Sequence, residues 1–255
     1  MRRAIILAAG YGSRLVGAAD PPKPLVEVAG RALLHRIVSQ LHAVGIREVV
    51  VVIGHRGEMI RAAFREWSLG VDVVLLEHDR FDLPNGTSLL RAAAFIEGPT
   101  LLTMSDHLCS PGLLQTVIDA PFDAALSVLG VDRDVAACFD VDDATKVRLD
   151  GDSIVAIGKE LRRFDALDTG IFRVTPDLVD ALAALDGARG VSLSEGVARL
   201  AKRGRFKAVD VGDEPWIDVD TPEARRAAEA MLLRYGDDFS VRLPRRPLPS
   251  ALLGA

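Results

Sequence analysis

Cysteine is scarce in this chain of 255 residues, which contains only Cys109 and Cys138. Two distant cysteines are too few for a disulfide framework or a zinc knuckle, and this favours a reducing compartment. No stretch approaches the roughly 18 consecutive apolar residues of a transmembrane helix. The apolar run at residues 4–9 is too short for a secretion signal, and the charged Arg14 comes soon after it. We therefore expect a cytoplasmic protein without a membrane span.

Basic residues are also fewer than acidic residues. The 31 lysines and arginines stand against 36 aspartates and glutamates, which makes the formal net charge −5. This balance disfavours a dedicated nucleic-acid-binding protein, whose phosphate contacts need a basic face. With 49% hydrophobic and 26% charged residues, the composition is typical of a globular enzyme, and the length permits one large α/β unit.

Short, β-rich apolar runs alternate with longer segments of helical period in the first half of the chain. Because helical crossovers join successive strands, we expect these strands to lie parallel. The predicted fold class is α/β, with a doubly wound, mainly parallel (Rossmann-like) sheet that is covered on both faces. The expected strands are residues 5–8, 48–53, 71–77, 100–104 and 124–131, and the expected helices are residues 32–43, 57–67, 87–95 and 111–119.

The pattern changes after about residue 132. Apolar runs flank Asp150-Gly151-Asp152, a turn signal that predicts an antiparallel hairpin added to the parallel sheet. A proline- and arginine-containing tail, residues 236–255, is expected to lie outside the core. The remaining expected elements are a strand at 168–174, helices at 176–185 and 192–202, a strand at 206–211, and a last helix at 220–234.

A strand that runs into a glycine loop, Leu7-Ala8-Ala9-Gly10-Tyr11-Gly12-Ser13-Arg14-Leu15, is the strongest local signal, and Pro22-Lys23-Pro24-Leu25 comes after it. Glycines let backbone N–H groups approach phosphates, and Arg14 and Lys23 add cationic donors. A dinucleotide fingerprint would need glycine at position 15, which is leucine. A tight turn alone leaves Pro-Lys-Pro unexplained. We predict a triphosphate cradle made of Leu7, Ala8, Ala9, Gly10, Gly12, Ser13, Arg14 and Lys23.

These two segments resemble the nucleotidyltransferases that join a nucleoside triphosphate to a sugar or alcohol phosphate and release pyrophosphate. Within that family the chain is most similar to CTP:inositol-1-phosphate cytidylyltransferases, with phosphocholine and phosphonate cytidylyltransferases as close relatives. The resemblance covers roughly residues 3–234, and its later segments are residues 85–90, 103–107, 144–147, 157–161 and 168–170. It implies cytidylyl transfer from CTP to a polyol or alcohol phosphate, which forms a CDP-alcohol. The alternatives are a sugar-1-phosphate nucleotidyltransferase with another triphosphate, and a non-catalytic nucleotide-binding regulator.

Two carboxylates are candidates to hold Mg²⁺. Asp106 lies just past a predicted buried strand, at the carboxyl edge where open α/β sheets place their ligands. Mg²⁺ takes one or two protein carboxylates beside phosphate and water oxygens. Asp218 and Asp220 are both candidates for the second carboxylate. The resemblance selects Asp218, two residues after Trp216, and Asp220 is also a candidate cap of the last helix.

The resemblance also implies roles for other residues. Lys23 would stabilise the α-phosphate of the nucleotide, Arg14 the leaving phosphates, and Lys159 the incoming phosphate; Lys159 also fits a solvated edge-strand lysine. The sequence places Asn85, Gly86, Thr87 and Ser88 at a helix start, where they meet the base or ribose or simply form a turn and cap. Ser105 is a further nucleotide-binding candidate, and the acceptor-binding candidates are His107, Lys159, Asp168, Thr169 and Gly170. Asp140, Asp142 and Asp143 are interpreted as a solvated loop.

We therefore expect one nucleotidyltransferase domain at residues 1–235, with a nucleotide-binding half at 1–131 and an acceptor-binding half at 132–235. The expected ligands are CTP, Mg²⁺ and a small phosphate-bearing alcohol. Some inositol-type relatives are fused to a membrane-embedded transferase that consumes the CDP-alcohol. This sequence has no apolar span before Ala255, so a separate enzyme for that step, and a homodimer, are the protein partners we consider.

Overall fold

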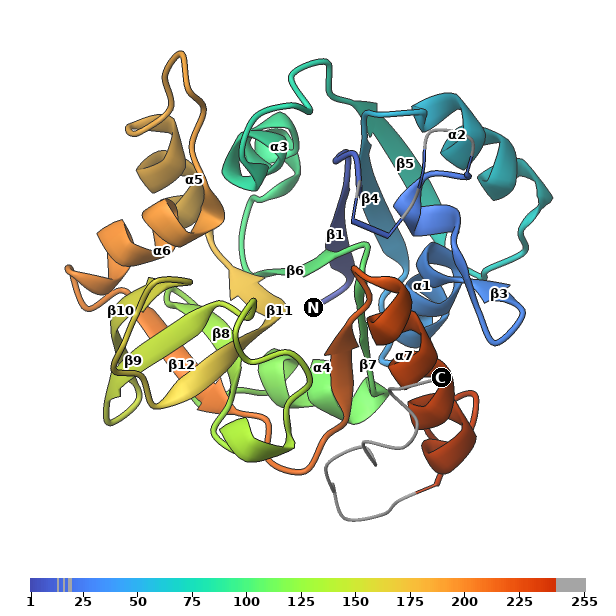
Figure 1. The fold of residues 1–255 in the computed structure, drawn as a ribbon. Helices are drawn as coiled ribbons and strands as arrows, with labels where there is room; N and C mark the ends of the chain where they lie inside the picture. Colours follow the sequence, from blue (N-terminus) through green and yellow to red (C-terminus); the bar gives the residue numbers. More distant parts are fainter. Residues whose placement is uncertain (13, 16, 18–19, 242–255) are drawn as a thin grey trace.

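The computed structural model describes residues 1–12, 14–15, 17 and 20–241 (Figure 1). Within these residues, nine strands form one sheet in the order β5-β4-β1-β6-β11-β8-β12-β10-β9. The strands of this sheet are β1 (Arg3–Ala8), β4 (Glu48–Ile53), β5 (Asp72–Glu77), β6 (Thr100–Met104), β8 (Ser127–Asp132), β9 (Lys146–Asp150), β10 (Ser153–Gly158), β11 (Ala166–Val174) and β12 (Phe206–Asp210). The helices are α1 (Leu33–Ala43), α2 (Gly57–Glu66), α3 (Asn85–Arg91), α4 (Pro111–Ile118), α5 (Pro176–Ala183), α6 (Leu193–Ala201) and α7 (Pro222–Tyr235).

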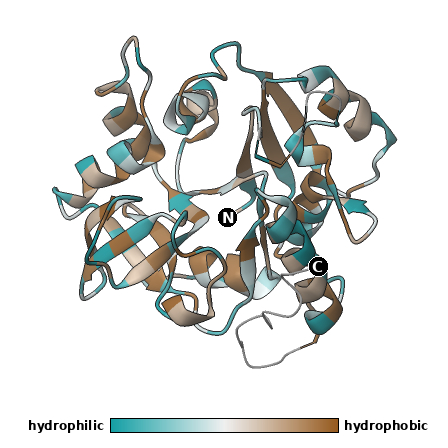
Figure 2. Ribbon diagram, viewed as in Figure 1, coloured by the Kyte–Doolittle hydropathy of each residue, from teal (hydrophilic) through white to brown (hydrophobic). Residues whose placement is uncertain are grey.

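The first half of the sheet is parallel, as the sequence predicts. Strands β4 and β6 both pair with β1 in parallel, and β5 pairs with β4 in the same direction. Buried residues of β1 alternate between the two faces: Ile5 and Leu7 pack with α3, α5 and α6, whereas Ala4 and Ile6 pack with α1, α2 and α4. Helices therefore cover both faces, and Figure 2 shows the central strands as largely hydrophobic. The doubly wound α/β class is confirmed.

The second half joins this sheet in its middle and not only at its edge. Strand β11 lies between β6 and β8 and is antiparallel to both, while β12 pairs with β8 in parallel. The hairpin of β9 and β10 forms where Asp150-Gly151-Asp152 predicts it, with Gly151 at φ +56°. Strand β11 is apolar at Ile171, Phe172 and Val174 and buried along almost its whole length, so it suits a central position with both faces covered.

Two short strands pair although they come from distant parts of the chain. Strand β7 (His107–Cys109) pairs in antiparallel fashion with β13 (Trp216–Asp218), and this register places Asp218 opposite His107. Figure 1 shows the two strands side by side next to α7. A second small pair consists of β2 (Glu27–Val28) and β3 (Arg31–Ala32). Neither pair is predicted from the sequence, because a strand of two or three residues is too short to show an alternating hydrophobic pattern.

The C-terminal end departs from expectation near residue 237. Phe239 is 5% exposed and packs with α7 in a third core cluster, and Asp237 accepts a 2.6 Å hydrogen bond from the buried Arg36. The prediction that this segment lies outside the core is wrong for Phe239. Phe239 packs against apolar residues of α7, and the buried charge of Arg36 is paired with the Asp237 carboxylate. The rest of the predicted tail, residues 242–255, lies outside the described residues. Among the residues described, no helix is both long and apolar enough to cross a membrane.

Candidate active site

Residues from both halves of the sheet line one open cavity of about 190 Å³. Its lining includes residues from β6, β10, β11 and β13 and from the loop between β8 and β9. The predicted site residues on its lining are Asn85, His107, Lys159, Asp168, Gly170, Asp218 and Asp220. Met104, Phe172 and Trp216 add an apolar portion to the wall. The cavity therefore combines charged groups of both signs with apolar surface.

The glycine loop after β1 is shaped around Lys23, which lies further along the chain. Gly12 has φ +65°, and a Cβ built there would lie 2.5 Å from the Cβ of Lys23. Glycine at this position therefore allows the Lys23 side chain to lie against the loop. Leu7, Ala8 and Ala9 have buried side chains, so only their backbones can meet a ligand. Ser13 lies outside the described residues, and Gly10 is exposed.

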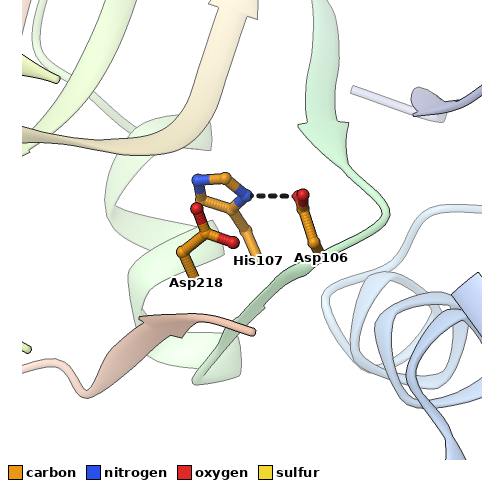
Figure 3. Close-up of side chains that lie close together, drawn as sticks. All are labelled: Asp106, His107 and Asp218. Atoms are coloured by element: carbon orange, nitrogen blue, oxygen red, sulfur yellow. Dashed lines mark hydrogen bonds and ion pairs between the residues drawn. The ribbon is translucent and has the colours of Figure 1, made fainter. Parts of the chain in front are cut away.

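Lys23 and Asp106 form the centre of the charged cluster. The Lys23 Nζ donates a 2.7 Å hydrogen bond to Asp106 Oδ2 and lies 3.8 Å from Asp218 Oδ1. His107 Nδ1 donates a 2.7 Å hydrogen bond to the other oxygen of Asp106, as Figure 3 shows. The antiparallel pairing of β7 and β13 brings Asp218 into this group. One potential ligand atom from each of Asp106, His107 and Asp218 lies within 4.8 Å of the others.

The charges of this cluster depend on one another. Although burial favours the neutral acid, Lys23 and His107 hold the pKa of Asp106 below its usual range. Burial opposes the charged form of His107, but Asp218 and Asp106 raise its pKa to about 9. Burial, followed by the repulsion of Asp106, raises the pKa of Asp218 to about 6. The two carboxylates therefore repel each other and favour a cation between them.

Asp106 and Asp218 have the donor set of a divalent cation site. Asp218 Oδ1 is buried and accepts no hydrogen bond from any residue that the structure describes, so this oxygen is open to a cation. Two carboxylates suit a hard cation that completes its shell with phosphate and water oxygens. His107 orients Asp106 through its hydrogen bond, as neighbours of metal-binding carboxylates commonly do.

Asp220, the other candidate for the second carboxylate, also lines the cavity but has a different partner. It is buried and forms an ion pair with Arg14 from the glycine loop. It also does not cap α7, since Thr221 Oγ1 accepts the capping hydrogen bond from Ala224 N. The structure thus pairs Asp218 with Asp106 and Asp220 with Arg14.

Asp143 joins the predicted phosphate-binding cations of the two halves, a role that the sequence does not indicate. Its carboxylate accepts a 2.7 Å bond from Arg14 and a 2.9 Å bond from Lys159. Partial burial opposes its charge, but these two cations hold the pKa of Asp143 below its usual range. The interpretation of this acidic run as a solvated loop is wrong for Asp143. Nothing in the local pattern shows which of its carboxylates faces a cation.

The predicted acceptor segment of β11 faces in two directions. Asp168 and Gly170 line the cavity, and Asp168 Oδ1 accepts a 2.7 Å bond from Gly170 N. Burial raises the pKa of Asp168 to about 6. Gly170 has φ +72°, and any Cβ there would collide with the His107 ring. Thr169 is 0% exposed and donates to Gly130 O at 2.7 Å, so the structure turns this side chain towards β8 and away from the cavity.

The start of α3 supports the segment before α6. Asn85 Oδ1 accepts a 3.0 Å bond from Leu193 N, and Thr87 Oγ1 accepts a 3.2 Å bond from Val191 N. A Cβ on Gly86 would lie 2.6 Å from Val191 O. These contacts give the residues a structural role at the cavity wall. Two further nucleotide-binding candidates, Ser88 in α3 and Ser105 directly after β6, are buried.

A glycine loop with two cations and a carboxylate at the carboxyl edge of parallel strands, joined here by a second carboxylate from β13, is typical of proteins that act on nucleoside triphosphates. Residues 4–194 match the family described as the MobA-like NTP transferase domain. The chain belongs to this family, and it is a nucleotidyltransferase.

Individual relatives show a more specific likeness. The chain is 38% identical to a bifunctional IPC transferase and DIPP synthase of Rubrobacter xylanophilus, over 91% of this chain and 52% of that protein. A protein of the same name from Aquifex aeolicus is 34% identical over 94% and 55%. The chain therefore spans about half the length of these curated relatives. Among solved structures, the inositol-1-phosphate CTP transferase from T. maritima matches with a TM-score of 0.82 and 25% identity, over 94% of this chain and 96% of that one.

Proposed function

We propose that this protein transfers a cytidylyl group from CTP to inositol 1-phosphate or a similar polyol phosphate. The reaction releases pyrophosphate and forms a CDP-alcohol. The observation that carries the proposal is the cluster of Lys23, Asp106 and Asp218, which adjoins the same cavity as Lys159 and Asp168. The names of the similar proteins, which include an inositol-1-phosphate CTP transferase, support this substrate pair.

The chemistry requires charge neutralisation more than bond activation. An oxygen of the acceptor phosphate attacks the α-phosphorus of CTP, and the bond between the α-phosphorus and the bridging oxygen of pyrophosphate breaks. The acceptor phosphate is already ionised, so no general base is needed. The protein must therefore bring two anions together and stabilise the charge that develops on the transferring group.

The described side chains divide this task between the two substrates. Lys23 stabilises the α-phosphate, and Arg14 stabilises the leaving phosphates. Asp106 and Asp218 would hold Mg²⁺, which when bound neutralises phosphate charge. The Lys23 ammonium lies beside both carboxylates, so the negative charge of Asp106 and Asp218 would attract both Lys23 and a bound Mg²⁺. The backbone of the glycine loop contributes the remaining nucleotide contacts in this proposal, together with Asn85, which lines the cavity.

On the acceptor side, Lys159 binds the incoming phosphate, and Asp168 and His107 meet the hydroxyl groups of the alcohol. With a pKa of about 6, Asp168 is mostly ionised at neutral pH and can accept hydrogen bonds from hydroxyl groups. Arg14 and Lys159 are bound to Asp143 in the structure, so substrate phosphates have to displace this carboxylate. We treat residues 1–131 and 132–235 as the two halves of one domain that serve the two substrates.

A matrix of pyrophosphate release tests the proposal. CTP, UTP, GTP, ATP and dTTP are each combined with inositol 1-phosphate, phosphocholine, 2-hydroxyethylphosphonate and glucose 1-phosphate, with and without Mg²⁺. We expect turnover with CTP and inositol 1-phosphate that requires Mg²⁺. A response to glucose 1-phosphate with another triphosphate would replace the proposal by sugar-nucleotide synthesis. Tight nucleotide binding without any pyrophosphate release would indicate a regulator.

A further inference from the structure

Asp132, the last residue of β8, is a carboxylate with no assigned role and 0% exposure. Its Oδ2 accepts hydrogen bonds from Trp216 Nε1 at 2.6 Å and from Cys138 Sγ at 3.2 Å. Its Oδ1 accepts a 2.9 Å bond from Asp134 N. A buried carboxylate is costly unless donors surround it, and bonds to an ionised acceptor are among the stronger ones. Asp132 therefore holds these three donors firmly.

One of the donors belongs to the cavity wall that carries a predicted metal ligand. Trp216 lines the cavity and is the first residue of β13, two residues before Asp218. Its backbone pairs with Cys109 of β7, while its indole N–H points to Asp132. The bond to Asp132 thus sets the orientation of the ring within the wall.

The other two donors belong to the loop that forms the neighbouring wall. Between β8 and β9 the chain has only one short 3-10 turn, Val135–Ala137, among its regular elements. The cavity-lining residues Phe139, Asp140 and Asp143 come soon after Cys138 in this loop. A loop with little regular structure keeps its shape through anchors, and the bonds from Asp134 N and Cys138 Sγ supply two of them.

We propose that Asp132 is a positioning residue for acceptor binding, which fixes Trp216 and the loop of residues 134–145 as two walls of the cavity. This inference rests on the proposed function, because it assigns the cavity to the acceptor phosphate. Asp132 accepts hydrogen bonds from Trp216 and from the loop, and it does not itself line the cavity. It acts by keeping a preformed pocket, which lowers the ordering that the acceptor would otherwise have to impose.

Conservative variants separate the hydrogen bonds from the bulk of the side chains. Trp216→Phe keeps an aromatic ring and removes the indole N–H. Cys138→Ala removes the thiol donor, and Cys138→Ser keeps a donor at the same place. Asp132→Asn presents an amide N–H₂ to groups that are themselves donors, so we expect it to lower the melting temperature, and it serves as a stability reference. Trp67→Phe is the control, because Trp67 packs against His35 and Phe64.

The readout is the KM for each substrate in the pyrophosphate-release assay with Mg²⁺. We expect Trp216→Phe and Cys138→Ala to raise the KM for inositol 1-phosphate about three- to tenfold, the range of one lost hydrogen bond. The KM for CTP should rise less than the KM for inositol 1-phosphate, because Lys23, Asp106 and the glycine loop, which bind the nucleotide in this proposal, lie outside these two walls. Cys138→Ser should restore most of the acceptor affinity, which a merely space-filling role for the thiol would not require.

Trp216 also offers a spectroscopic readout, since Trp67 and Trp216 are the only tryptophans of the chain. In a Trp67→Phe background, addition of inositol 1-phosphate should change the emission of Trp216. The same addition should change it less, or only at higher concentration, when Cys138→Ala is added.

The possible outcomes distinguish the two hypotheses. A wild-type enzyme that is silent towards every acceptor overturns the proposed function, and this inference with it. An active wild type whose variants lose thermal stability but keep the acceptor KM overturns the inference alone. An equal rise in the KM for CTP and for inositol 1-phosphate also overturns it, because the walls would then not be specific to the acceptor.

Discussion

The two halves of the sheet place their site residues by different means. In the first half, Asp106 comes after β6, which lies beside β1 in a parallel sheet, and the glycine loop comes after β1. Helical crossovers make these strands parallel, so their carboxyl ends lie at the same edge of the sheet. In the second half, Asp168 lies within the inserted antiparallel strand β11, and Asp218 lies in a three-residue strand. Their positions depend on pairings between segments far apart in sequence.

In the proposed mechanism, much of the nucleotide-binding charge and most of the cavity wall come from different halves of the sheet. The parallel half supplies a loop and a strand end, a design that many nucleotide-binding sheets share. The antiparallel half supplies most of the cavity lining, which includes Lys159 and the loop with Asp143, while the first half adds Asn85, Met104 and His107. Substitutions in the two halves should therefore differ in kind, and variants on each side can test that difference.

The largest effect is expected for Lys23→Ala, which removes a buried cation that lies 2.7 Å from Asp106. We expect kcat to fall on the order of 10²–10³-fold, as for the loss of one preorganised charge that faces the transition state. The measurement is CTP-dependent pyrophosphate release, with Lys202→Ala on the exposed end of α6 as the control. Near-normal turnover of Lys23→Ala would exclude a catalytic role for this lysine.

The next effect concerns the carboxylate that the antiparallel half contributes. Asp218→Asn should raise the Mg²⁺ concentration for half-maximal activity about 10–100-fold, because it weakens a cation ligand. Asp220→Asn should shift it less, since Asp220 pairs with Arg14. Mg²⁺ titrations of both variants check this. The reverse order would make Asp220 the metal ligand and would contradict the pairing of Asp106 with Asp218.

A third prediction concerns stability and pH in the acceptor half. Burial raises the pKa of Asp168 to about 6 from 3.8, so the folded chain keeps a proton there that the unfolded chain has lost. Between about pH 4 and pH 6 this carboxyl group therefore destabilises the fold progressively as pH rises. Asp168→Asn removes the cost and can still accept the bond from Gly170 N. We expect the variant to gain about 3 kcal/mol over wild type by pH 7 and almost nothing at pH 4.

Urea unfolding of the two proteins across this pH range provides the measurement. Asp152→Asn, at the exposed turn between β9 and β10, is the control for loss of one negative charge. A difference between Asp168→Asn and wild type that does not vary with pH would show that the Asp168 carboxyl group titrates in its ordinary range.

The smallest effect is expected where the two halves meet, at Asp143. Asp143→Asn releases Arg14 and Lys159 for substrate phosphates, so the KM for both substrates should fall. Because these ion pairs are half-exposed, we expect about a two- to fivefold change at low salt that shrinks at high salt. Asp140→Asn in the same loop controls for the change in net charge. A rise in the acceptor KM would instead mean that Asp143 itself binds the acceptor.

Much of the fold can be predicted from local pattern. Strands 48–53 and 100–104 form where their apolar runs predict, with the same bounds, and α1 begins one residue after its expected start. The hairpin at residues 146–158 forms around its predicted turn. In contrast, β7 and β13 are too short to show an alternating hydrophobic pattern. The central position of β11 depends on its pairing with β6 and β8, which no local pattern predicts.

The candidate site shows the same division. The sequence indicates Lys23, Asp106 and Asp218 as residues of matching chemistry, and the structure brings them together. It does not reveal that Thr169 points away from the cavity or that Asp143 bridges two cations. Neighbouring residues of a strand point to opposite faces of the sheet. A register shift of one residue would exchange the residues that face the cavity with those that face away from it.

By itself, the sequence determined the α/β class, the parallel order of the first strands, the glycine loop and the chemical types of the site residues. These depend on periodicity and on residues close together in the chain, where few arrangements are sterically open. Only the tertiary structure decided that Asp218 lies opposite His107, that Asp220 pairs with Arg14, and that Asp132 anchors Trp216. Such contacts join segments many residues apart, and the packing of the whole core selects them.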